Sequence, residues 1–213
     1  MSTTPNPTKK SVTPNPIKDS GSRTHYNTGA VRDVRIGKGR MDLVPLDIAN
    51  ALYNFAPIDA PYLAQHEMRS LEGDNVLAFI DRFIYCGDCD ALIAAMLEII
   101  TQNYMFFEKY LETATELGVS IDEKNVMLRQ VVAHAIIMLS QHFENGALKY
   151  EPRNWEKGID LNAFVDSGAR HYAKVLSGFD DEPHHLAALW NLMCAIWTYR
   201  NKPELNNLPC AKH

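Results

Sequence analysis

The stretch ALIAAMLEIITQNYMFFEKYL (91–111) decides the fold class, because its apolar residues recur at helical spacing over many turns. We expect Asp88 to cap this helix and Gly118 to end it. A helix that is apolar nearly all round is buried, either in the core of one chain or between subunits. The apolar residues on its several faces are Leu92, Ile93, Met96, Leu97, Ile99, Ile100, Tyr104, Phe106, Phe107 and Leu111.

Helical spacing continues on both sides of this stretch, and we find no alternating strand pattern and no internal repeat. Asp74 and Asp122 are expected caps for two of the further helices. The sequence therefore predicts an all-α helical bundle, with additional helices over 45–55, 61–71, 75–85, 122–150, 162–176 and 183–200.

Two N-terminal segments depart from the helical pattern. Residues 1–18 contain four prolines among polar residues and are predicted to be a disordered tail. Residues 19–45 carry four glycines and no sustained apolar period, so we expect an irregular segment. The remainder, 19–213, is predicted to be a single domain.

Composition and cysteine spacing disfavour several classes of function. The net charge of −5 disfavours a nucleic-acid binder, which is usually basic. No run approaches 18 apolar residues, and the polar N-terminus does not resemble a signal peptide, so we expect no membrane partner and a cytoplasmic location. Cys86 and Cys89 lack a second cysteine pair, which favours reduced cysteines in a turn over a zinc site.

The segments DSGSRTHYNTGAVRD (19–33) and GKGRMDLVP (37–45) combine cations with glycines. Arginine forks and backbone approach at glycine suit a phosphate group, although a solvated basic loop has the same composition. The segment is not a Walker loop, because Gly39 follows Lys38 where Ser or Thr is needed. The cations are Arg23, Arg32, Arg35, Lys38 and Arg40.

The segment HFENGALKYEPRNWEKG (142–158) places Glu144 near a helix end, with Lys149 and Arg153 following. A surface salt bridge is the simpler interpretation of such a pattern. Trp155 could stack on a base or pack in the core.

The segment DSGARHYAKVLSGFDDEPHHLAALWN (166–191) contains paired carboxylates and histidines. Spacing by three or four residues places both members of a pair on one helix face. Acidic residues at a helix start also complement the helix dipole, so a metal site is one of two interpretations. The pairs are Asp181–His184, Glu182–His185, Asp166–Arg170 and Ser167–His171, with Asn191 on the side of His184.

Together these segments resemble the phage dATP/dGTP diphosphohydrolases, which are related to the MazG-like all-α NTP pyrophosphatases. The resemblance rests on D-S-G-x-R (19–23), T-G-A-V-R-D (28–33), G-K-G-R-x-D-L-x-P (37–45), E-N-G-A-L-K-Y (144–150), R-N-W-x-K-G (153–158), R-H (170–171) and D-D-E-x-H-H with W-N (180–191).

The resemblance implies an all-α NTP pyrophosphatase fold with an irregular N-terminal phosphate-binding segment. It also implies Mg²⁺ or Mn²⁺, cleavage of dGTP or dATP to the monophosphate and pyrophosphate, and assembly into a homo-oligomer, a dimer or tetramer. Phage relatives adjust the nucleotide pool of infected cells, which would place the chain in the host cytoplasm. The helical stretch at about 60–125 lies outside the motifs and is expected to be an insertion.

The MazG-like enzymes generally carry E-x-x-E on one helix and E-x-x-D on another. Here Ala147 stands three residues after Glu144, and His184 or His185 stands where a second carboxylate is expected. A non-catalytic helical nucleotide-binding or assembly protein is therefore the alternative interpretation.

The expected site residues fall into three groups. The metal ligands are Glu144, Asp181, Glu182, His184 and His185, and the catalytic residues are Glu144, Glu182 and Lys149. Tyr26 is an alternative to Trp155 for stacking on the base. The substrate-binding residues are Arg23, Thr28, Gly29, Arg32, Lys38, Gly39, Arg40, Arg153, Asn154, Trp155, Arg170, His171 and Asn191.

Overall fold

The computed structural model describes residues 21–55, 75–103 and 121–212. These residues divide into two compact units between Ile36 and Gly37, and each unit is described by itself. The expected tail at 1–18, the helix expected at 61–71, the cap Asp74 and the end of the long helix beyond Asn103 lie outside the described residues.

The first unit contains a small β-hairpin. Strand β1 (Arg23–His25) pairs antiparallel with β2 (Val31–Asp33), and an ion pair at 2.6 Å joins Arg23 to Asp33. In the turn, the amide of Gly29 donates to the carbonyl of Tyr26 at 2.9 Å, with Gly29 at a positive φ of 86°. The sequence predicted no strand here, and that prediction was wrong, because three-residue strands are too short to show an alternating pattern.

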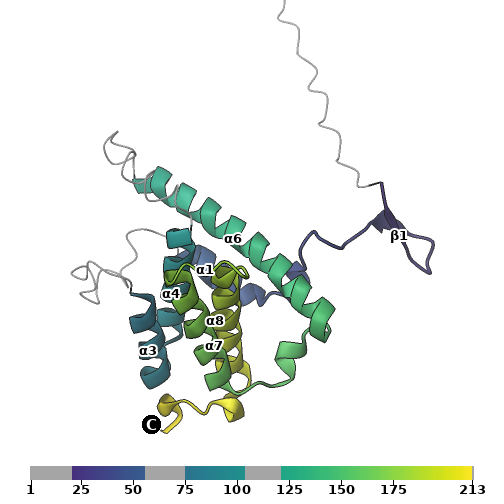
Figure 1. Cartoon of the computed structure of the whole chain (residues 1–213). Helices are drawn as coiled ribbons and strands as arrows, with labels where there is room; N and C mark the ends of the chain where they lie inside the picture. Colours follow the sequence, from purple (N-terminus) through teal and green to yellow (C-terminus); the bar gives the residue numbers. More distant parts are fainter. Residues whose placement is uncertain (1–20, 56–74, 104–120, 213) are drawn as a thin grey trace, which may run out of the picture. The chain divides into compact units, whose positions relative to one another are not determined.

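The second unit is helical, which confirms the predicted all-α class (Figure 1). The helix bounds agree with the predictions to within one or two residues wherever those residues are described. The helices are α1 (Leu46–Phe55), α3 (Val76–Cys86), α4 (Cys89–Asn103), α6 (Ile121–Tyr150), α7 (Leu161–Leu176) and α8 (His184–Asn201), with short 3-10 segments at Met41–Leu43, Asn154–Lys157, Pro203–Leu205 and Pro209–Lys212.

Helices α4 and α8 form the centre of the core. Residues 91–97 of α4 are all buried, and α4 packs against α1, α3, α6 and α8. The apolar surface of its described part is therefore covered within a single chain and does not by itself indicate a subunit interface. The carboxylate of Asp88 accepts hydrogen bonds from the amides of Asp90 and Ala91 at 3.1 and 3.3 Å, so the predicted cap is confirmed. No described helix has the length and apolar character needed to cross a bilayer.

Helices α7 and α8 pack closely at Gly168. A Cβ at this position would lie 3.0 Å from Cδ2 of Leu192 and 3.4 Å from Cβ of Asn191. One turn later, the fully buried Tyr172 donates its hydroxyl proton to Oε1 of Gln102 on α4, at 2.8 Å. These contacts fix α7 against both core helices.

The close approach at Gly168 has a measurable consequence. Gly146 lies inside α6 with open space at its Cβ position, so Gly146→Ala should gain up to about 1 kcal/mol of helix propensity. Gly168→Ala gains the same propensity but forces Leu192 to move, which costs about 1–3 kcal/mol. Denaturant unfolding should therefore find Gly168→Ala less stable than Gly146→Ala. Equal stabilities would show that α7 and α8 are not tightly packed here.

Candidate functional site

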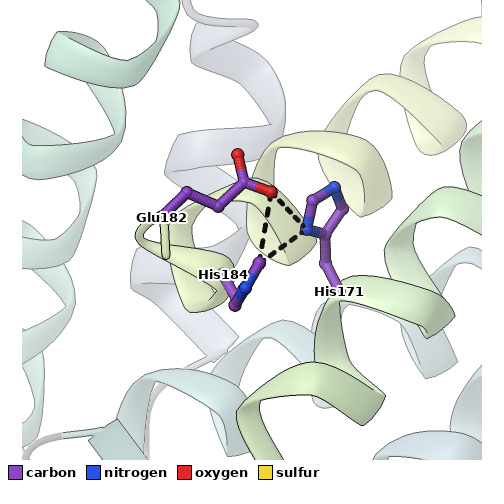
Figure 2. Close-up of side chains that lie close together, drawn as sticks. All are labelled: His171, Glu182 and His184. Carbon is purple, nitrogen blue, oxygen red and sulfur yellow. Dashed lines mark hydrogen bonds and ion pairs between the residues drawn. The ribbon is translucent and has the colours of Figure 1, made fainter. Parts of the chain in front are cut away.

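Three potential metal ligands converge where α7 meets the start of α8. His171 comes from α7, Glu182 from the loop at 177–183, and His184 is the first residue of α8. The two Nδ1 atoms are 3.0 Å apart, and Oε1 of Glu182 lies 3.4 Å from that of His171 and 3.3 Å from that of His184 (Figure 2). Within the described part of the chain, no other three His, Cys, Asp or Glu side chains gather in this way.

A second carboxylate orients one of the histidines. Nε2 of His184 lies 2.8 Å from Oδ1 of Asp181, and the His184 side chain is only 1% exposed. This hydrogen bond lowers the pKa of Asp181, with a smaller contribution from Lys174 at 3.8 Å. When Nε2 donates its proton to Asp181, Nδ1 of neutral His184 presents a lone pair towards Glu182 and His171.

The cluster fits a divalent transition metal. Separations of 3.0–3.4 Å among the three atoms are those of neighbouring ligands around one ion at about 2.0–2.2 Å from each. Imidazole nitrogens suit transition metals, whereas Mg²⁺ prefers a shell made of oxygen atoms. Two imidazoles with one carboxylate therefore fit Mn²⁺ better than Mg²⁺.

A cavity of about 270 Å³ adjoins the cluster. Burial is the main cause that lowers the pKa of His142 and of His171, which favours the neutral form of both imidazoles. Lys149 is exposed at the end of α6, and the neighbouring Tyr150 raises its pKa, with a smaller contribution from Glu182. The cavity is lined by His142, Gly146, Tyr150, Ser167, His171, Glu182, Ala187, Trp190 and Asn191.

A second cavity of about 330 Å³ shares three lining residues, Gly146, Tyr150 and Trp190, with the first. Four aromatic residues, Phe143, Tyr150, Trp155 and Trp190, contribute to its walls. Trp155 is 6% exposed and packs edge-on against Phe143 and Trp197, with ring centroids 5.9 and 4.9 Å apart. Trp155 is thus a wall of the cavity fixed in an aromatic cluster.

Glu144 binds the segment Gly37–Gly39, called the glycine loop below, and does not belong to the three-residue cluster. Its Oε1 accepts from the amide of Gly37 at 3.0 Å, and its Oε2 accepts from the amide of Gly39 at 2.9 Å. Residues two apart on a helix point about 200° apart, so Glu144 faces away from His142 and the cavity that His142 lines. The next amide, that of Arg40, donates to the carbonyl of Ser140 at 3.0 Å.

Glycine is required at the last position of this loop. Gly39 has a positive φ of 82°, and a Cβ there would lie 2.1 Å from Oγ of Ser140 on α6. Gly37 has a similar φ of 79° but open space around its Cβ position. The second glycine of the G-K-G motif is thus required by the contact of the loop with α6. Lys38 is exposed and lies in the sequence between Gly37 and Gly39, whose amides donate to Glu144.

Several arginines expected to bind phosphate already bind protein groups. Arg40 makes a two-pronged pair with Asp42, at 2.8 and 2.7 Å, which raises its pKa. Arg153 binds Glu156 and the carbonyl of Asp42, and Arg170 binds Asp166 at 3.2 Å as its spacing predicted. The remaining expected phosphate contacts Arg23, Thr28, Gly29 and Arg32 lie in the hairpin unit.

The structure also brings residues to the site that the sequence did not single out. His142, Gly146 and Tyr150 recur every four residues along α6 and so share the face that lines the cavity. Lys174 lies near the cluster through its pair with Asp181. His185, an expected ligand, lies outside the cluster and is partly buried, which lowers its pKa.

The contact between Glu144 and the glycine loop can be tested by hydrogen exchange. Glu144→Gln leaves one acceptor oxygen for two amides and removes the charge that strengthens both bonds, each worth about 1.5–3 kcal/mol. We expect the amides of Gly37 and Gly39 to exchange about tenfold faster or more in this variant. Glu151→Gln, on an exposed glutamate of the same region, should leave them unchanged. Equal protection in all three proteins would contradict the contact.

The buried histidines predict how stability depends on pH. Because folding lowers the pKa of His142 and His171, the unfolded chain binds more protons just below the ordinary histidine pKa of about 6.5. The free energy of unfolding of the metal-free protein should therefore decrease as pH falls through about 6.5. His142→Gln should make this decrease smaller, and His25→Gln, on an exposed histidine of the hairpin, should not. An unchanged pH dependence in His142→Gln would refute the assignment.

Residues 115–208 match the family model described as dATP/dGTP diphosphohydrolase, N-terminal. The match supports the family that the motifs indicated, and it contains the three cluster residues and the residues of α6 that line both cavities. It does not extend to the segment at 19–45. No curated protein and no solved structure matches the chain.

Proposed function

We propose, from the match of residues 115–208 to the N-terminal dATP/dGTP diphosphohydrolase family, that this chain hydrolyses a purine deoxynucleoside triphosphate to the monophosphate and pyrophosphate. The observation that carries the proposal is the cluster of His171, Glu182 and His184 beside a cavity. A phage function in adjusting the nucleotide pool accords with this reaction and remains part of the proposal.

The metal is proposed to be Mn²⁺, held by Nδ1 of His171, Nδ1 of His184 and a carboxylate oxygen of Glu182. When bound, such an ion polarises a phosphate oxygen and lowers the pKa of a water molecule. Asp181 keeps the imidazole of His184 in the tautomer that presents Nδ1 to this site. Glu144 is assigned to the glycine loop, and His171 replaces it as a proposed ligand.

Residues of the cavity and of its surroundings suit the hydrolysis itself. Attack of water on the α-phosphorus forms a new P–O bond, breaks the bond to the bridging oxygen and releases pyrophosphate. His142, kept neutral by burial, is proposed to accept the proton that this water loses. Lys149, in the last turn of α6, and Arg170, next to His171 on α7, are proposed to balance the charge of the leaving group.

Assembly into a dimer or tetramer also remains a proposal. Val126, Ile137 and Leu148 are 54%, 51% and 72% exposed on α6. Their spacing of eleven residues places them on one stripe along the helix. A second copy of the chain that covers this stripe would bury these three side chains.

A pyrophosphate-release assay tests the reaction. We expect the full chain to release pyrophosphate from dATP or dGTP, and to do so faster with Mn²⁺ than with Mg²⁺. Glu182→Gln should weaken Mn²⁺ binding, followed by electron paramagnetic resonance, by at least about tenfold and should lower turnover accordingly. Glu204→Gln, on an exposed glutamate of the segment Pro203–Leu205, should change neither.

Two outcomes would contradict the proposal. Full activity in Glu182→Gln would remove the cluster from the reaction. Failure of the wild-type chain to cleave any dNTP with either metal would favour the non-catalytic nucleotide-binding alternative.

A further inference from the structure

The two cavities beside the cluster differ in chemistry. The smaller contains the polar groups of His142, His171, Glu182 and Asn191. The larger is lined mainly by apolar and aromatic side chains, among them Phe143, Trp155 and Trp190. Because they share Gly146, Tyr150 and Trp190, one ligand with a polar end and an aromatic end can occupy both.

A nucleotide is such a ligand, with its sugar between the phosphates and the base. We propose that the larger cavity takes the purine base of the substrate and that the three shared residues surround its deoxyribose. This inference rests on the proposed function for the identity of the substrate. The volume of about 330 Å³ falls within the range of small-molecule sites, and aromatic walls favour a flat, two-ring base.

The polar residues at this cavity support a base rather than a second anionic group. Arg153 binds Glu156 and the carbonyl of Asp42, and Glu151 binds Lys157, so the charges that line the cavity are compensated within the chain. Asn154 adds a side-chain amide to the lining, and an amide can donate to and accept from the edge of a purine.

The backbone turn beside the cavity is held in an uncommon conformation. Among the described residues, Glu151 and Arg153 are the non-glycine residues with positive φ, at 104° and 59°. Such conformations cost energy and recur where a ligand has to be clamped. Both residues line the larger cavity.

Gly146 offers a substitution that closes the junction without disturbing the fold. A Cβ at this position meets no atom within 4 Å, and the residue lines both cavities. The side chain of Gly146→Leu would occupy the space assigned to the sugar. Asn145→Leu adds the same side chain one residue earlier, at an exposed position of α6 that lines neither cavity.

The test measures nucleoside binding to the full chain, because nucleosides lack the phosphates that the metal site would bind. Titrations of deoxyadenosine and deoxyguanosine followed by NMR should show weakening by about tenfold or more in Gly146→Leu, and wild-type affinity in Asn145→Leu. Thymidine, with its single ring, should bind more weakly than the purines. Mn²⁺ affinity should change by less than about twofold in both variants, which shows that the fold and cluster are intact.

The other outcomes distinguish a failure of the base-cavity assignment from a failure of the proposed hydrolysis. Equal nucleoside affinity in wild type and Gly146→Leu, or thymidine binding as tightly as the purines, would overturn the assignment. Pyrophosphate release without any detectable nucleoside binding would overturn it while leaving the proposed function standing. The wild-type chain could also bind nucleosides but release no pyrophosphate. If Gly146→Leu then lost nucleoside binding, the result would support the base cavity and contradict the proposed function.

Discussion

The close packing of α7 on α8 is the constraint on which the site depends. Gly168 lets α7 approach Leu192 and Asn191, and Tyr172 ties the same helix to α4. His171, one turn beyond Gly168, thereby reaches His184 at the start of α8, with their Nδ1 atoms 3.0 Å apart. A side chain at position 168 would push the helices apart, and separations of a few tenths of an ångström decide whether three atoms can share one ion.

Helix α6 serves the site through two different faces. One face carries His142, Gly146 and Tyr150 and lines the cavity beside the cluster. The other carries Glu144, whose carboxylate holds the amides of Gly37 and Gly39. A carboxylate that accepts from two backbone donors stabilises the loop.

The sequence predicted the helices well, because sustained apolar spacing and caps such as Asp88 are local signals. It also named Glu182, His184 and His171 as expected site residues, which the structure brings together, and it named Glu144 as an expected metal ligand, which the structure places against Gly37 and Gly39. That assignment depended on which face of α6 meets which neighbour, and tertiary packing alone determines this. The three-residue strands of the hairpin left no pattern to detect, and His142 was not among the expected site residues until the cavity lining placed it there.

The most direct measurement is anomalous diffraction from crystals of the full chain soaked with Mn²⁺. The account predicts a peak within about 2.0–2.4 Å of Nδ1 of His171, Nδ1 of His184 and a carboxylate oxygen of Glu182, with Glu144 still bound to Gly37 and Gly39. A peak at Glu144, or soaked crystals with no ion at the cluster, would contradict it.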